Sequence, residues 1–222
     1  MSRAIGGEET LRVRKTPGPG PRRILAAAAL STGAALLVFF LTHLSLALAL
    51  VATGSLAAGS ARHVWVRLAP AARREAAHRA RAGLLAGALA TAAYDGVRFL
   101  LVRMGDLSIR PFETFRLFGE LLTGSARSSN AALAAGTAYH LANGVAFAVA
   151  YALLLGERGW AYGLAWAMGL EVLMVTFYPG WLHLKALPEF LGVSILGHVA
   201  YGVVLGSCAR RAIRGTRAGG AA

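Results

Sequence analysis

The 222-residue chain has few charged side chains and a single cysteine. Asp, Glu, Lys and Arg make up 15% of its residues, whereas a typical soluble domain has about a quarter. With Cys208 alone, neither an intrachain disulfide nor a cluster of cysteine metal ligands can form. The sequence also lacks the glycine spacing of nucleotide-binding loops and the HExxH motif of zinc proteases. It therefore contains no local motif for a nucleotide or metal site.

Acidic residues are scarce beside the 23 Lys and Arg residues, and the formal net charge is +13. Such a balance can indicate nucleic-acid binding. Here, however, the arginines lie beside long apolar runs, without interleaved aromatic residues or the spacing of a zinc finger. We therefore expect no nucleic-acid partner, and interpret the charge as that of a protein embedded in a lipid bilayer.

The chain is rich in long apolar runs, and 56% of its residues are hydrophobic. Residues 130–155 contain no Asp, Glu, Lys or Arg, and a helix of this length crosses a hydrocarbon core of about 30 Å. Residues 24–61 are also uncharged, but one helix of that length would be nearly twice too long. We therefore predict a hairpin of two spans that turns near residues 42–45. Further spans are predicted at 82–102, 160–178 and 190–208.

These runs predict an all-α integral membrane protein with six transmembrane helices, a hairpin followed by a four-helix core at 82–208. The intervening segments are a disordered basic tail at 1–23, a basic connector at 62–81, a short amphipathic helix at 111–122, a loop at 179–189 and a basic tail at 209–222. Helix 111–122 would lie in the membrane interface or form an ordinary surface helix. Most of the Lys and Arg residues then fall on the side of both tails, which places both termini in the cytoplasm.

Titratable residues occur inside four of the predicted spans, about 5 to 9 residues from the outer ends, or ~8–14 Å below the outer boundary. They are Asp95, Arg98, His140, Glu171 and His198. Helical spacing places Asn143 on the face of His140, and Tyr201 on the face of His198. Because charge in hydrocarbon costs several kcal/mol, we expect these groups to face one another inside the bundle.

The two histidine helices share a short pattern. His140 and His198 are each followed four residues later by a glycine, Gly144 or Gly202, and each histidine helix follows an antiparallel helix that carries an acid. The pattern indicates a weak parallel repeat. Gly202 also begins a GxxxG motif, which is typical of close helix packing and would allow a homo-oligomer through small-residue faces.

Several functions fit this polar layer. The group, with Asn143 and Tyr201, could form a proton or ion path for transport. Alternatively, His140, His198, Glu171 and Asp95 could bind a divalent metal, or the two histidines could hold a haem. A structural or assembly protein without a catalytic site is the third alternative, and the sequence leaves open whether the protein is an enzyme.

Three segments carry a resemblance to a known group of proteins. Residues 139–156 (YHLANGVAFAVAYALLLG), 163–180 (GLAWAMGLEVLMVTFYPG) and 197–206 (GHVAYGVVLG) are similar to segments of the small bacterial inner-membrane proteins typified by YagU. The resemblance covers roughly residues 82–208, and residues 24–61 have no counterpart in it. It implies a four-span core, the bacterial inner membrane and a loose link to stress or acid tolerance. It assigns no catalytic role to any residue.

Overall fold

The computed structural model describes residues 20–105, 107, 113–177 and 187–219, and the regular structure within these residues is entirely helical. This confirms the predicted all-α class. The helices are α1 (Gly20–Ala29), α2 (Ser31–Thr42), α3 (Leu46–Arg67), α4 (Pro70–Met104), α5 (Glu113–Thr123), α6 (Asn130–Leu155), α7 (Trp160–Phe177) and α9 (Leu187–Gly219).

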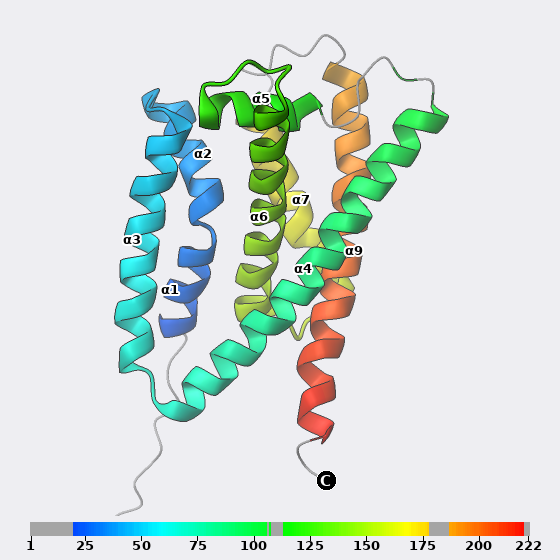
Figure 1. Ribbon diagram of the computed structural model, residues 1–222. Helices are drawn as coiled ribbons and strands as arrows, with labels where there is room; N and C mark the ends of the chain where they lie inside the picture. The colour runs from blue at the N-terminus through cyan, green and yellow to red at the C-terminus, as the bar shows by residue number, and fades with distance from the viewer. Residues whose placement is uncertain (1–19, 106, 108–112, 178–186, 220–222) are drawn as a thin grey trace, which may run out of the picture.

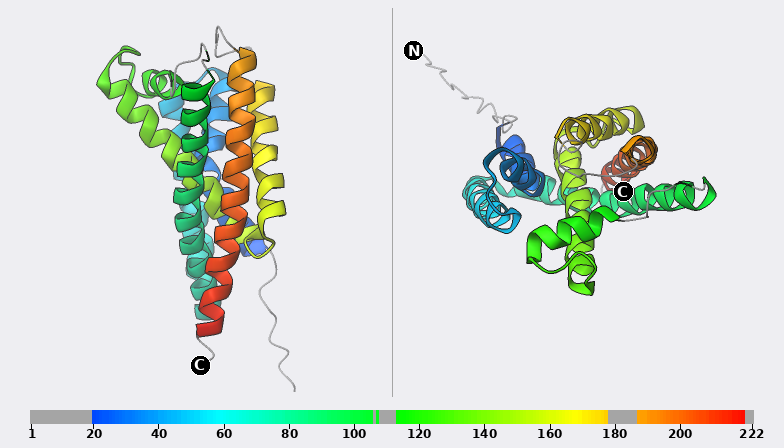
Figure 2. Two further views of the ribbon diagram at one scale, coloured as in Figure 1. Left: turned by 90° about the vertical axis from the view of Figure 1, so that its right-hand side faces the viewer. Right: turned by 90° about the horizontal axis from the view of Figure 1, so that it is seen from above.

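The helices form an elongated bundle in which successive elements alternate in direction (Figure 1). In that view α1 and α2 rise, α3 descends, α4 rises diagonally, α6 descends, α7 rises and α9 descends. Helix α5 lies across the upper end, beside the start of α6. Seen from above, α6 lies between α1–α3 and the pair formed by α7 and α9 (Figure 2). The start of α1 and the end of α9 therefore share the lower end of the bundle.

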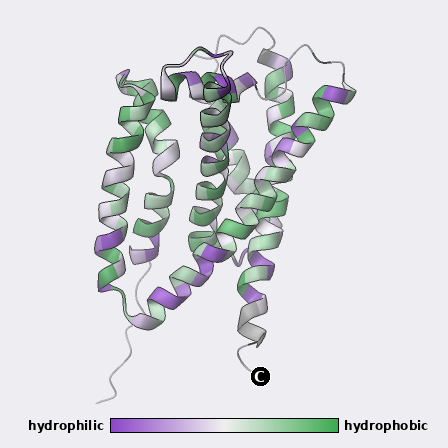
Figure 3. Cartoon of the chain, viewed as in Figure 1, coloured by the Kyte–Doolittle hydropathy of each residue, from purple (hydrophilic) through white to green (hydrophobic). Residues whose placement is uncertain are grey.

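The bundle buries small side chains and exposes large apolar ones. Fully buried positions include Ala35, Ala49, Ala90, Ala148, Ala150 and Ala167, whereas Leu48, Leu56, Leu85, Leu89, Leu100 and Val172 are more than half exposed. In water, the hydrophobic effect would favour burial of the leucines. In lipid, leucine side chains gain little from burial, and helices associate instead through small residues that let their backbones approach closely. The hydropathy colouring in Figure 3 shows mainly hydrophobic residues along the middle parts of the helices.

Four helices are long and apolar enough to cross a membrane: α4, α6, α7 and residues Pro188–Gly215 of α9. The helix pair α1 and α2 also passes this test when taken together, although it is bent by 61°. Helix α3 is not among the candidate spans. The fold thus fits a helical membrane protein with a core of four apolar helices.

The predicted first span is two helices rather than one, because the chain bends at Leu30 between α1 and α2. Just after the bend, the Thr53 hydroxyl donates to the Ser31 carbonyl at 3.1 Å, and the Tyr139 hydroxyl donates to the Thr32 carbonyl at 2.9 Å. These bonds connect the first turn of α2 to α3 and α6.

The hairpin turn lies where the sequence predicts it. Helix α2 ends at Thr42, and His43 follows with a φ of 58° in the left-handed region. The Ser45 side chain then caps α3 by accepting from the Leu48 amide at 3.3 Å. A left-handed residue and a serine cap reverse the chain within three residues.

Two predicted boundaries are wrong because helices continue beyond the apolar runs. Residues 62–81 do not form a separate connector: α3 runs to Arg67, and α4 begins at Pro70, which occupies its first turn. At the other end, α9 continues to Gly219, through most of the expected tail. Alanine and arginine are good helix formers, so hydropathy marks the apolar part of each helix and misses its ends. The expected tail at 1–19 and the loop at 178–186 lie outside the described residues.

Helix α5 packs against the first half of α6. Its buried side includes Phe115, Leu117 and Phe118. Gly119 on α5 and Gly136 on α6 each face the backbone of the other helix without space for a Cβ. Helix α5 is therefore packed closely against α6 at the upper end of the bundle.

Candidate functional site

The structure divides the predicted polar layer into two acid–histidine pairs. In the first, His140 Nε2 on α6 lies 3.1 Å from Asp95 Oδ2 on α4. With Asp95 ionised, its oxygens only accept, so Nε2 carries the hydrogen in this contact. Arg98, one turn further along α4, has a guanidinium nitrogen 4.0 Å from the other Asp95 oxygen. The Phe115 ring of α5 lies over His140, with ring centroids 4.5 Å apart.

The second pair joins α7 to α9 and is more deeply buried. Glu171 is 2% exposed, and its Oε2 lies 2.8 Å from His198 Nδ1. The same nitrogen lies 3.0 Å from the Ser194 carbonyl. Both neighbours are acceptors, so Nδ1 carries the hydrogen. The two histidines therefore present opposite ring nitrogens to their carboxylates.

The two pairs share one antiparallel register. On α4 and α6, Thr91 packs against Gly144, and one turn away Asp95 meets His140. On α7 and α9, Ala167 packs against Gly202, and one turn away Glu171 meets His198. In each case the glycine four residues after the histidine lets the acid-bearing helix approach. The predicted repeat thus corresponds to two equivalent helix contacts.

Tyr94 lies between the pairs, and the sequence reasoning missed it. Its ring centroid is 5.7 Å from that of His140 and 4.9 Å from that of His198. Its hydroxyl oxygen is 3.5 Å from Ser194 Oγ, and the Arg98 guanidinium lies 5.1 Å from its ring centroid. Tyr94 precedes Asp95 and lies four residues before Arg98, so helical spacing could have indicated it.

Ser194, which sequence reasoning did not single out, contacts the second pair. It is fully buried, and its hydroxyl donates to Glu171 Oε2 at 2.9 Å. A nucleophilic serine would donate to one histidine nitrogen while the acid held the other. Here the serine and the acid face the same nitrogen of His198. Ser194 is therefore a hydrogen-bonding partner of the acid rather than an activated nucleophile.

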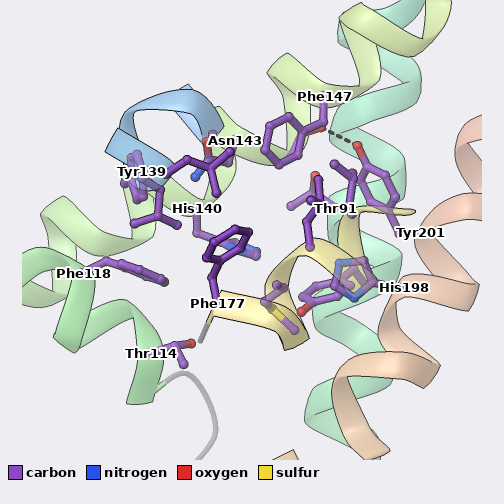
Figure 4. Close-up of a pocket in the computed structure, with 18 of the residues that line it drawn as sticks. Thr91, Thr114, Phe118, Tyr139, His140, Asn143, Phe147, Phe177, His198 and Tyr201 are labelled. Carbon is purple, nitrogen blue, oxygen red and sulfur yellow. Dashed lines mark hydrogen bonds between the residues drawn. The ribbon is translucent and has the colours of Figure 1, made fainter. Parts of the chain in front are cut away.

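The remaining predicted residues, Asn143 and Tyr201, line a cavity beside the pairs. Tyr201 donates to the Gly144 carbonyl at 2.6 Å, and Asn143 Oδ1 is buried without a hydrogen-bond partner. Figure 4 shows both side chains around the same space as Thr91, His140 and His198. The cavity has a volume of about 400 Å³. It lies among α2, α4, α5, α6, α7 and α9.

The geometry does not gather the four predicted metal ligands into one set. Among the described residues, no three His, Cys, Asp or Glu side chains come close enough to hold a metal ion. Asp95 and His140 form one pair, and Glu171 and His198 form the other. The ring of Tyr94 packs against both imidazoles, so the histidines do not face each other across an open slot. Metal and haem binding remain predictions from the sequence alone.

A further charged cluster lies at the lower end of the bundle. Arg79 on α4 is 6% exposed and is paired with Glu75 at 2.7 Å and with Glu157 in the turn between α6 and α7. From the sequence, Arg79 was expected in a basic connector. In the structure it joins α4 to the turn between α6 and α7.

Comparison with known proteins identifies a family but gives no function. Apolar helices around paired polar groups are the features of a helical membrane protein. Residues 77–217 match a family described as "Family of unknown function (DUF6789)", and because the match covers more than half of the chain, the chain belongs to that family. No curated protein and no solved structure matches. The resemblance to the YagU group gains no support from these matches and remains a prediction.

Proposed function

We propose that this protein handles protons within the bilayer, through the pairs Asp95–His140 and Glu171–His198. The observation that carries the proposal is the contact of each imidazole with a carboxylate, at 3.1 and 2.8 Å, on helices apolar enough to span a membrane. Histidine is the side chain best suited to gain and lose a proton near neutral pH. Titratable groups inside membrane spans commonly mark proton relays.

The charge of each pair depends on one proton. Glu171 with His198 is neutral when the imidazole is protonated and carries one negative charge when it is not. Asp95 with His140 also has Arg98 beside it, so this group carries one positive charge when the imidazole is protonated and is neutral when it is not. An uncompensated charge is costly away from water, so proton gain or loss should alter how the helices and the cavity accommodate that charge. A change of this kind can couple proton binding to movement of an ion or solute.

A continuous series of hydrogen bonds extends from the Glu171–His198 pair to Tyr94, but it does not reach the Asp95–His140 pair. Glu171, Ser194 and Tyr94 follow one another at 2.9 and 3.5 Å. Among the described residues, no hydrogen bond continues from the Tyr94 hydroxyl to the Asp95–His140 pair. A proton crossing between the pairs would need water or a ligand in the adjoining cavity. This favours proton-coupled transport over proton conduction along a permanent series of hydrogen bonds.

We also propose the six-span arrangement, with both termini in the cytoplasm of a bacterium and the helices in its inner membrane. The alternating helix directions and the shared lower end of α1 and α9 support it (Figure 1). The exposed arginines at that end, including Arg74, Arg158 and Arg211, agree with the positive-inside rule.

The test uses the purified protein in liposomes that contain a pH-sensitive dye. After a pH step with a potassium diffusion potential, wild type should equilibrate protons faster than empty vesicles. The double variant His140→Gln with His198→Gln keeps hydrogen-bonding groups but cannot take up the proton, so flux should fall at least about tenfold. His63→Gln, at an exposed position on α3, is the matched control. Undiminished flux in the double variant would refute proton handling by these pairs.

A further inference from the structure

The cavity beside the two acid–histidine pairs is lined mainly by aromatic rings and hydrocarbon. Eight of its lining residues are Phe or Tyr, and most of the others are Leu, Gly, Ala or Met. Its volume of about 400 Å³ is within the range of sites for small organic ligands. Aromatic side chains offer flat apolar faces against which another ring can stack. The lining therefore suits a lipid-soluble aromatic molecule.

The charges at the cavity favour a neutral ligand. Among the described residues that line it, Arg98 is the one Lys, Arg, Asp or Glu side chain. A guanidinium nitrogen of Arg98 lies 4.0 Å from Asp95, so this charge already has a partner. A charged ligand would bring a further, unpaired charge into an apolar site, which is costly away from water.

Each histidine of the two pairs has a second ring nitrogen that a ligand can use. His140 contacts Asp95 through Nε2, and His198 contacts Glu171 through Nδ1. The other nitrogens, His140 Nδ1 and His198 Nε2, have no hydrogen bond within the described part of the chain, yet both keep accessible surface. Both side chains line the cavity (Figure 4). These nitrogens are therefore polar atoms that an occupant of the cavity can reach.

The two free nitrogens differ in hydrogen-bonding character when each group is charge-balanced. Asp95 and Arg98 balance each other, so His140 is neutral in that state and its Nδ1 accepts a hydrogen bond. His198 is the one ion-pair partner of Glu171 among the described residues. That pair is balanced when the imidazole is protonated, and its Nε2 then donates. The cavity thus offers one acceptor and one donor.

One small molecule can approach both imidazoles, because a single side-chain ring separates them. The Tyr94 ring centroid lies 5.7 Å from that of His140 and 4.9 Å from that of His198. A benzene ring with hydroxyls on opposite carbons has a polar group at each end, and each hydroxyl can both donate and accept. Such a ring would donate to one imidazole and accept from the other.

We propose that this cavity binds a hydroquinone, a neutral aromatic diol, with its ring among the aromatic side chains and its hydroxyls at His140 Nδ1 and His198 Nε2. An alkylated hydroquinone dissolves in lipid and can enter from the bilayer. The assignment concerns binding and includes no electron transfer. It uses the geometry of the acid–histidine pairs but not proton flux, so failure of the flux test would leave it intact.

The experiment measures binding of duroquinol, which is tetramethylhydroquinone, to the full-length protein in a maltoside detergent. Equilibrium dialysis under nitrogen with dithionite keeps the ligand reduced, and detergent without protein gives the background. Two matched ligands keep the ring and its methyl groups: the dimethyl ether of duroquinol has no hydrogen to donate, and durene has no oxygen. Both should bind at least about tenfold more weakly than duroquinol. Equal binding of duroquinol and durene would overturn the hydroxyl assignment.

Two variants locate the ligand. His140→Phe keeps a ring against Phe115 and removes the acceptor nitrogen, so it should weaken duroquinol about tenfold and leave durene binding unchanged. The retained durene binding would show that the cavity is intact. Ala34→Trp fills the cavity from α2 and should abolish binding of both ligands, whereas Ala58→Trp on an exposed face of α3 should bind as wild type does. Unchanged duroquinol binding in either His140→Phe or Ala34→Trp would overturn the proposal.

Discussion

Gly144 on α6 packs directly against Thr91 on α4, without room for a Cβ between them. This contact lies one helical turn from the pairing of Asp95 with His140. The glycine therefore sets the distance between the two helices and, through it, the distance between acid and imidazole. Gly202 has the same place on α9, where a Cβ would lie 2.7 Å from Leu164 Cα and 2.9 Å from Ala167 Cβ.

We expect Gly144→Ala and Gly202→Ala to destabilise the protein, because a methyl group must push a helix aside. Overpacking of this kind costs about 1–3 kcal/mol. Gly202→Ala should be the more severe, since it meets backbone atoms, whereas Gly144→Ala meets only the Thr91 side chain. Thermal unfolding in detergent, followed by circular dichroism, measures the effect.

Two further variants separate this mechanism from general helix effects. Thr91→Ala should restore much of the stability that Gly144→Ala loses, because it removes the clashing side chain. Gly169→Ala on α7, where a Cβ would meet nothing within 4 Å, should leave the melting temperature unchanged or slightly higher. Independent, additive effects of Thr91→Ala and Gly144→Ala would contradict the proposed contact.

The same residues show how far sequence reasoning reaches. Asp95, Glu171 and the two histidines could be predicted to lie together, because charge inside an apolar run demands partners. The His-x3-Gly pattern even indicated the repeat. Which acid pairs with which histidine could not be predicted, because that depends on helix register. Pattern alone did not reveal Tyr94, since an aromatic residue inside a span is ordinary.

Helix ends and bends were harder to predict for a different reason. Hydropathy located α6 to the residue, since its flanks are polar turns. It missed the extension of α9 to Gly219, because a charged helix looks like a solvated tail. It also missed the bend at Leu30, after which Thr53 and Tyr139 on other helices donate hydrogen bonds to the first turn of α2. Contacts between helices therefore influence where helices end and bend, and the local sequence does not reveal these contacts.

The two histidines should have opposite tautomers when neutral. His140 presents Nε2 to Asp95, and His198 presents Nδ1 to Glu171 and the Ser194 carbonyl. Solid-state NMR of ¹⁵N-histidine-labelled protein in lipid should therefore show one histidine protonated at Nε2 and one at Nδ1. His140→Gln and His198→Gln assign the signals. Two signals of the same tautomer would show that the carboxylates do not orient these rings.

Arg79 should contribute to stability more than any exposed arginine. It is 6% exposed and is paired with Glu75 and Glu157, which are themselves partly solvated. Removing one partner leaves charge uncompensated, so Arg79→Ala should lower the free energy of unfolding by about 1–3 kcal/mol. Arg74→Ala, at an exposed position one turn earlier on α4, is the control and should change stability by less than about 0.5 kcal/mol. Equal effects of the two variants would mean that the cluster adds no stability.

The proposed orientation can be tested cleanly because the chain has one cysteine. Cys208 lies within α9, and Cys208→Ala would give a background without thiols. Ser128→Cys, exposed between α5 and α6, should react with a membrane-impermeant maleimide added to bacterial spheroplasts, in which the inner membrane is intact and the outer membrane has been opened. Gly215→Cys, exposed near the end of α9, should react only after the membrane is permeabilised.

The two positions should label differently because the connection between α5 and α6 and the end of α9 lie at opposite ends of the bundle (Figure 1). Every Lys or Arg near the lower end should favour retention of that end in the cytoplasm. The reverse labelling pattern would place the basic end outside and contradict both the orientation and the charge argument. Labelling of both positions in intact cells would contradict the spanning arrangement itself, because one face of a bilayer cannot expose both ends of a spanning bundle.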